Sequence, residues 1–306
     1  MFRHLLDYVF FWLKSTNAHG IHSPFIFQLY NEVIGSEKEY YCFQEIENIR
    51  WQLLLDEKII TINDLGAGSK TSRTDTRKLN KIVNNSTTSP DKAQLLFKLV
   101  DFCQPATLLE LGTSVGLTSL YLAEAMPTEA TLYTFEGDQT LINIAKTNAE
   151  AYFKAKTTFP TSKNIEFVLG NIDETLSSKI KQLDKIDFAF FDANHREKPT
   201  LEYFELCLTK ADENAVFVFD DIYWSAEMKN AWISIQKHPQ VTISVDLFDF
   251  PKHCKITKQF SECFLNFPLK KIIKGLLTYL FKFLLCRSCI FLKDSTEIFL
   301  VERTNS

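Results

Sequence analysis

Residues 107–116 read Thr-Leu-Leu-Glu-Leu-Gly-Thr-Ser-Val-Gly, and this stretch decides the fold. A short apolar run ends at Glu110 and Leu111, and two glycines, Gly112 and Gly116, follow four positions apart. The run is apolar enough for a strand covered on both faces, and residues 117–126 continue with helical spacing. The pattern predicts a buried strand that turns directly into a helix, with glycines that let a ligand approach the backbone closely.

A second strand pattern, residues 130–135, ends in Glu136, Gly137 and Asp138. A carboxylate at the end of this strand can accept hydrogen bonds from both hydroxyls of a ribose. Strand, glycine turn, helix, strand and acid in this order are typical of nucleoside-binding sites in doubly wound sheets. A dinucleotide-binding loop would read Gly-x-Gly-x-x-Gly, whereas this turn reads Glu-x-Gly-x-x-x-Gly.

Strand and helix patterns alternate from residue 107 onward. The expected strands are 107–111, 130–135, 164–169, 186–191, 214–219 and 241–247, and the expected helices are 117–126, 138–154, 172–182, 197–209 and 225–237. This alternation predicts the α/β class, with a doubly wound, mostly parallel, Rossmann-like sheet and right-handed crossovers.

Composition narrows the function classes. A net charge of −4 argues against nucleic-acid binding through bulk electrostatics. Residues 1–13 include Arg3, His4 and Asp7, so they lack the apolar core of a secretory signal. Without such a signal, the seven cysteines are expected to be reduced thiols, and the expected location is the cytoplasm.

Residues 1–88 are expected to form an N-terminal helical extension that caps the acceptor site. Ser23-Pro24 predicts the start of a helix over 25–34, and Ser89-Pro90 predicts the start of a helix that ends at about Cys103. His19 and His22 would either line a site from above or only shape a loop. A second glycine-rich stretch, Asp64 to Lys70, lacks the apolar helix that must follow a cofactor turn, so it is expected to be a loop over the cofactor mouth.

Polar residues follow most of the predicted strands. They are Glu110 near the end of the first strand, Glu136, Asn171 with Asp173, Asp192, and the pair Asp220 and Asp221. Ligands of such sheets lie beyond the carboxyl ends of the strands, so these residues are expected at one edge. Two carboxylates on adjacent strand ends can hold Mg²⁺ or a similar divalent cation.

The Glu-x-Gly-x-x-x-Gly turn resembles the first motif of class I methyltransferases that use S-adenosylmethionine (SAM). The resemblance implies a cofactor site in which the turn holds the methionine end and the acid after the second strand holds the ribose. Asn171 and Ile172 would border the adenine, and Asp192 would lie near the sulfonium. The implied cofactor-binding residues are Glu110, Gly112, Thr113, Ser114, Gly116, Glu136, Gly137, Asn171, Ile172 and Asp192.

Residues 89–250 more narrowly resemble the catechol and caffeoyl-CoA O-methyltransferase group. The matching residues are Asp192-x-x-His195, Tyr203-Phe-Glu205 and Asp220-Asp221-x-x-Trp224. The resemblance implies a divalent metal on Asp192, Asp220 and Asp221. It also implies catalytic roles for Asp192 and for His195, which stands where the group has lysine.

Two positions depart from that group, because His195 replaces a lysine and Asp221 an asparagine. A histidine can still take a phenolic proton, so His195 is a candidate general base. Alternatively, His195 is a surface residue of a metal-free relative. Asp220 and Asp221 would then be one cofactor-facing or helix-capping acid beside one solvated acid.

The C-terminal part departs from the resemblance. Residues 251–285 are an apparent insertion, and 286–306 predict a hairpin of 287–292 with 297–302 that completes the sheet. Residues 268–285 are apolar with four lysines and no acid, which fits peripheral membrane contact or packing against the domain or a homodimer partner. Cys286 and Cys289 form one isolated pair, too little for a zinc site.

Together these patterns predict a SAM-dependent methyltransferase that O-methylates a small hydroxylated acceptor, with divalent-metal assistance. One alternative is a metal-free methyltransferase acting on nitrogen, protein or RNA. Another is a non-catalytic SAM-fold subunit that docks to a membrane or protein partner.

Overall fold

The computed structural model describes residues 7–8, 11–13, 15–16, 23–62, 76–156, 163–247, 256–258 and 296–300, the last two ranges as backbone only. Several sequence predictions lie outside these ranges. They concern His19 and His22, the glycine-rich stretch 64–70, the basic apolar segment 268–285, and the cysteine pair 286 and 289. No helix of the described part is long and apolar enough to cross a membrane.

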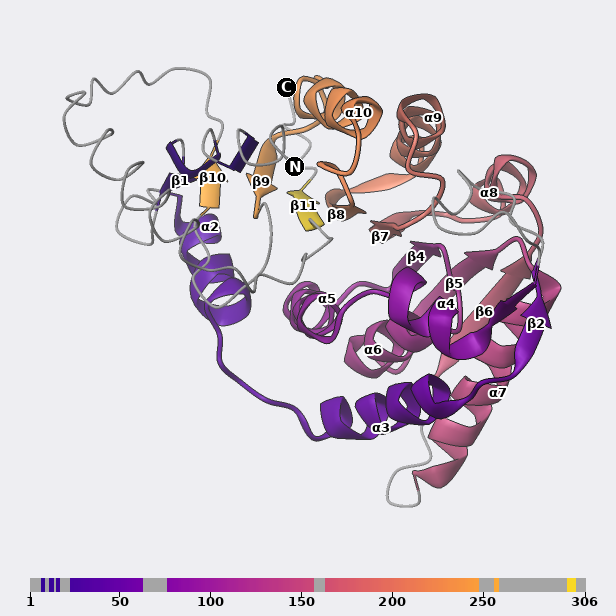
Figure 1. Ribbon diagram of the computed structural model, residues 1–306. Helices are drawn as coiled ribbons and strands as arrows, with labels where there is room; N and C mark the ends of the chain where they lie inside the picture. The colour runs from indigo at the N-terminus through magenta and orange to yellow at the C-terminus, as the bar shows by residue number, and fades with distance from the viewer. Residues whose placement is uncertain are drawn as a thin grey trace, which may run out of the picture.

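Five parallel strands form the centre of the main sheet in the spatial order β6, β5, β4, β7, β8 (Figure 1). Their bounds are β4 Thr107–Leu111, β5 Thr131–Glu136, β6 Asn164–Leu169, β7 Ile186–Phe191 and β8 Ala211–Asp220. The order reverses between β4 and β7, which makes their carboxyl ends the topological switch point. The predicted doubly wound α/β fold is therefore confirmed.

Helices cover both faces of this sheet (Figure 1). One face carries α5 (Pro90–Cys103), α6 (Leu117–Ala125) and α7 (Gln139–Ala155), and the other carries α8 (Ile172–Ile180), α9 (Glu197–Leu208) and α10 (Ala226–Gln236). Successive strand residues point to opposite faces, so Val216 and Val218 enter one buried core while Phe217 and Phe219 enter the other. The predicted elements of this region are all present, with ends shifted by a few residues.

The sheet continues beyond β8 with short strands. β11 (Thr296–Leu300) lies between β8 and β9 (Ile243–Asp246) and runs antiparallel to both. β10 (Ile256–Lys258) joins β9 to β1 (Ser15–Thr16). Both edges of β11 are thus hydrogen-bonded to strands of the core, and its predicted hairpin partner at 287–292 lies outside the described residues.

The N-terminal part packs under α5 and α6. It contains α2 (Pro24–Leu29), which runs on into a π-helical turn (Tyr30–Ile34), then α3 (Tyr41–Leu55), β2 (Ile59–Thr61), β3 (Thr76–Lys78) and α4 (Leu79–Ser86). The antiparallel pair of β2 and β3 was not expected, because each strand has only three residues. The Thr140 hydroxyl at the start of α7 donates to the Thr61 carbonyl at 3.3 Å, so this pair ends beside α7.

Candidate active site

The turn after β4 is fixed by the neighbouring chain. The backbone N–H groups of Gly112 and Thr113 both donate to the carbonyl of Phe135, at 3.1 and 2.9 Å. Gly112 has φ +110°, and a Cβ there would lie 2.3 Å from the Asp192 carbonyl oxygen. Gly116 has φ +83°, and a Cβ there would lie 2.8 Å from the Cβ of Ala145. Contacts within the protein therefore already require both glycines.

Glu136 ends β5 directly beside this turn. Its two carboxylate oxygens accept the N–H of Ser114 at 2.9 Å and the N–H of Asp138 at 3.0 Å. Burial raises the pKa of Glu136, and these backbone hydrogen bonds lower it. The structure thus holds an oriented carboxylate next to the glycine turn, as the sequence predicts.

Glu110 is fully buried beneath the turn. The hydroxyls of Ser119 and Thr134 donate to its Oε2, whereas its Oε1 has no hydrogen-bond partner. Burial raises the pKa of Glu110 to about 7 despite those two hydrogen bonds. The buried Ser114 hydroxyl oxygen also has no hydrogen-bond partner.

Thr113, by contrast, has its side chain in the protein interior. It is 2% exposed, and its hydroxyl is hydrogen-bonded to that of Thr134 in the interior. Its backbone is also engaged within the protein, because its N–H donates to the Phe135 carbonyl and its carbonyl accepts the N–H of Gly116 at 2.9 Å. Gly137, the next predicted residue, contributes a backbone hydrogen bond that lowers the pKa of Glu136.

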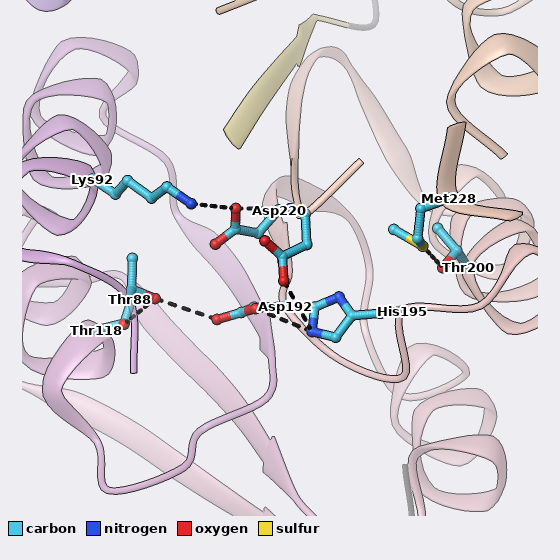
Figure 2. Close-up of polar contacts among 9 residues, drawn as sticks. Thr88, Lys92, Thr118, Asp192, His195, Thr200, Asp220 and Met228 are labelled. Atoms are coloured by element: carbon cyan, nitrogen blue, oxygen red, sulfur yellow. Dashed lines mark hydrogen bonds and ion pairs between the residues drawn. The ribbon is translucent and has the colours of Figure 1, made fainter. Parts of the chain in front are cut away.

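Asp192 follows β7 at the switch point, where its N–H donates to the Leu111 carbonyl at 2.9 Å. The Thr88 hydroxyl donates to Asp192 Oδ2 at 3.3 Å, and the Thr118 hydroxyl donates to Thr88 at 3.0 Å (Figure 2). Burial and the negative charges of Asp220 and Asp221 raise the pKa of Asp192 well above its ordinary value. Sequence reasoning missed both threonines, because nothing local distinguishes them from ordinary loop and helix residues.

Lys92 of α5 reaches the same cluster from the side of Thr88, opposite His195 (Figure 2). Its Nζ lies 2.8 Å from Asp220 Oδ1, and the two side chains are only 3% and 6% exposed. Oδ1 of Asp220 also accepts the N–H of Asp221 at 2.8 Å. Lys92 was not predicted, and its one sequence signal is a cation in the first turn of a helix, where the helix dipole disfavours positive charge.

His195 faces two of the carboxylates. Its Nε2 lies 3.7 Å from Asp192 Oδ1 (Figure 2) and 4.0 Å from Asp221 Oδ2. Within the described part of the chain, five non-glycine residues have positive φ, and four of them follow β4, β7 or β8: Ser114, Asn194, His195 and Asp221. Such backbone conformations cost energy and cluster at functional sites, which supports a site at this edge of the sheet.

The far end of the site is formed by the loops after β6 and β7. Asn171 caps α8 by accepting the N–H of Asp173 at 3.1 Å, and Ile172 is partly buried beside it. The Tyr203 hydroxyl donates to Asp173 and accepts from Asn194 Nδ2 at 3.1 Å. This chain of contacts ties the Asn171 loop to the loop that carries Asp192.

The three carboxylates predicted to bind a metal do not fit a divalent ion as their side chains lie. Asp220 is paired with the Lys92 ammonium, which competes for the same oxygen. Among the described residues, no group of three acidic, histidine or cysteine side chains could hold a metal ion. The donor set therefore differs from what the resemblance implies.

Comparisons with known proteins find similarity to methyltransferases. A family model described as a methyltransferase domain matches residues 109–222. A catechol O-methyltransferase from Niastella koreensis is 27% identical over 135 residues, which are 44% of this chain and 57% of that protein. A transmembrane O-methyltransferase homolog from Rattus norvegicus is 40% identical over 57 residues, which are 19% of this chain and 22% of that protein. The chain thus spans less than two thirds of the length of these relatives.

Two solved structures share the fold at low sequence identity. The O-methyltransferase from Bacillus cereus in complex with SAH has a TM-score of 0.53 at 14% identity, over 87% of this chain and 93% of that one. The O-methyltransferase TomG from Streptomyces achromogenes in complex with SAM has a TM-score of 0.53 at 14% identity, over 91% of this chain and 95% of that one. Residues 109–222 therefore resemble a methyltransferase domain, and the chain has the class I, Rossmann-like fold of these two structures.

Proposed function

We propose that this protein is a SAM-dependent methyltransferase that transfers a methyl group to a hydroxyl of a small acceptor. The observation that carries the proposal is the pairing of two features at one switch point. Glu136 is fixed beside the glycine turn by the Ser114 N–H, and Asp192 with His195 stands at the adjoining strand end. The first feature suits a ribose, and the second suits a hydroxyl that must lose its proton.

The residues of this chain fit SAM on two counts. Glu110 Oε1 and Ser114 Oγ are buried polar atoms without hydrogen-bond partners, and such atoms are rare unless a ligand or water satisfies them. Glu136 would accept the ribose hydroxyls, Asn171 and Ile172 would border the adenine, and Glu110 would face the amino-acid end of the cofactor. When bound, SAM supplies an electrophilic methyl group for in-line displacement.

His195 would act as the general base toward the acceptor hydroxyl. Its Nε2 lies 3.7 Å from Asp192 Oδ1 and 4.0 Å from Asp221 Oδ2, so both carboxylates would stabilise the imidazolium that forms when the imidazole takes the acceptor proton. The imidazole would take the proton of the acceptor hydroxyl as the oxygen attacks the methyl group. The protein must also align the acceptor with the methyl group and exclude water from the site. The buried turn and the loops after β6 and β7 would do both.

Calorimetric titration with SAM tests this proposal. The wild-type protein should bind SAM with micromolar affinity. Glu136→Ala should weaken binding by about tenfold or more, because a hydrogen bond to a charged group contributes roughly 1.5 to 3 kcal/mol. Glu129→Ala is the matched control, because Glu129 is an exposed acid in the turn before β5, at the opposite end of that strand. No SAM binding by the wild type would refute the proposal.

Transfer itself is tested with isotopically labelled SAM and a panel of phenolic and other hydroxylated acceptors. His195→Ala should reduce turnover by about 100-fold or more while SAM affinity stays within about twofold, as expected for a lost general base. If the variant lost turnover and SAM affinity together, His195 would belong to the cofactor site, and its assignment as the base would fail.

A further inference from the structure

We propose, resting on the function proposed above, that Lys92 supplies the positive charge of this carboxylate cluster and that the enzyme works without a divalent metal ion. Three carboxylates, Asp192, Asp220 and Asp221, gather at the carboxyl ends of β7 and β8. The proposal concerns which cation balances them. Lys92 Nζ lies 2.8 Å from Oδ1 of Asp220, one of the three carboxylates on which the family resemblance implies a metal.

The position of Lys92 is unfavourable for a lysine with no other role. It is the third residue of α5, where the helix dipole repels positive charge, and its side chain is 3% exposed. Burying an ammonium there costs desolvation free energy that only a close counter-charge offsets. Asp220, itself 6% exposed and 128 positions away in sequence, is that counter-charge.

A divalent ion would have to share Asp220 with this ammonium. Asp220 Oδ1 already accepts from Lys92 Nζ and from the Asp221 N–H, each at 2.8 Å. A metal bound to Asp220 would lie within a few ångströms of the ammonium, and two cations at that separation repel strongly inside a protein. Asp192 is likewise engaged, because Oδ2 accepts from the Thr88 hydroxyl and Oδ1 faces the His195 imidazole.

This arrangement bears on the class of acceptor. A metal-assisted site favours two neighbouring hydroxyls, which chelate the ion together. A site balanced by Lys92 and served by His195 needs only one hydroxyl with a removable proton. We therefore expect single phenols or enols to be methylated as well as vicinal diols.

Binding of Mn²⁺, followed by electron paramagnetic resonance on the full-length protein, tests the proposal without relying on activity. The wild type should show no saturable Mn²⁺ binding at millimolar ion. Lys92→Gln removes the ammonium from Asp220 and should show saturable Mn²⁺ binding, with a dissociation constant about tenfold or more below the highest ion concentration that leaves the wild type unsaturated. Addition of Asp220→Asn should abolish that gain. Lys98→Gln is the matched control, because Lys98 is a part-buried lysine of the same helix that donates to the Ser36 carbonyl instead.

Stoichiometric, micromolar Mn²⁺ binding by the wild type that Asp220→Asn abolishes would overturn metal independence, even if Lys92→Gln failed to fold. A folded Lys92→Gln variant that gains no Mn²⁺ affinity would overturn the assignment of the charge to Lys92. Calorimetry with SAM on the same samples separates the two proposals, because absent SAM binding refutes the methyltransferase function whereas Mn²⁺ binding refutes only this inference.

Discussion

Replacement of Gly112 by alanine should destabilise the protein by about 2 to 6 kcal/mol, as the sum of two costs. A non-glycine residue at φ +110° pays roughly 1 to 3 kcal/mol of backbone strain. The new Cβ would also lie 2.3 Å from the Asp192 carbonyl oxygen, closer than real Cβ contacts come. The turn after β4 and the loop after β7 must therefore separate, and such overpacking costs about 1 to 3 kcal/mol.

Gly170→Ala provides the matched control, because Gly170 has φ +130° but its Cβ would meet only the Thr175 methyl group, at 3.0 Å. Both variants pay the backbone strain, so the difference between them isolates the collision with Asp192. Urea denaturation followed by circular dichroism should show a loss in the free energy of unfolding that is larger for Gly112→Ala than for Gly170→Ala by about 1 to 3 kcal/mol. Equal losses, within about 0.5 kcal/mol, would refute the contact as the reason for this glycine.

Three further predictions concern single side chains. The folded-state pKa of Glu110 is raised to about 7, so the folded protein holds that proton more tightly than the unfolded chain. Stability without ligand should fall by about 3 kcal/mol as pH rises from about 4.5 to about 8, and a pH series of urea midpoints should show this slope reduced in Glu110→Gln. Tyr203→Phe breaks the link between Asp173 and Asn194 and should cost about 1 kcal/mol in the same assay; an unchanged midpoint would show that the link carries no stability. Asp138 caps α7 by accepting two N–H groups, at 2.8 and 2.9 Å, so Asp138→Ala should cost about 1 to 2 kcal/mol while Asp138→Asn costs less. Equal thermal shifts for the two Asp138 variants would contradict this assignment.

Local patterns predicted most of the core. The apolar run before Gly112 and the acid after the next strand are read from neighbouring residues, because strand burial and helix periodicity are properties of short segments. Alternation of strands and helices then restricts the sheet to parallel crossovers, which brings Glu136 and Asp192 to one edge. Asn171 and Asp220 follow by the same rule.

The sequence did not predict strand pairings that involve very short strands or residues far apart in the chain. The three-residue strands β2 and β3 carry too little pattern to be recognised. The position of β11 between β8 and β9 depends on pairing over a long separation, which no local signal specifies. The metal set Asp192, Asp220 and Asp221 was inferred from resemblance, and its fit depended on a residue outside those motifs.

The sequence by itself determined the α/β class, the glycine turn and the acids that follow the strands, because each is encoded within a few adjacent residues. Only the tertiary structure decided what surrounds them. Packing places the Asp192 carbonyl where only glycine fits at position 112, and it brings the Thr88 hydroxyl to Asp192. It also places Lys92 against Asp220, which is 128 positions away in sequence. The charge and the close contacts of the site arise where separate segments meet, and that meeting is a property of packing.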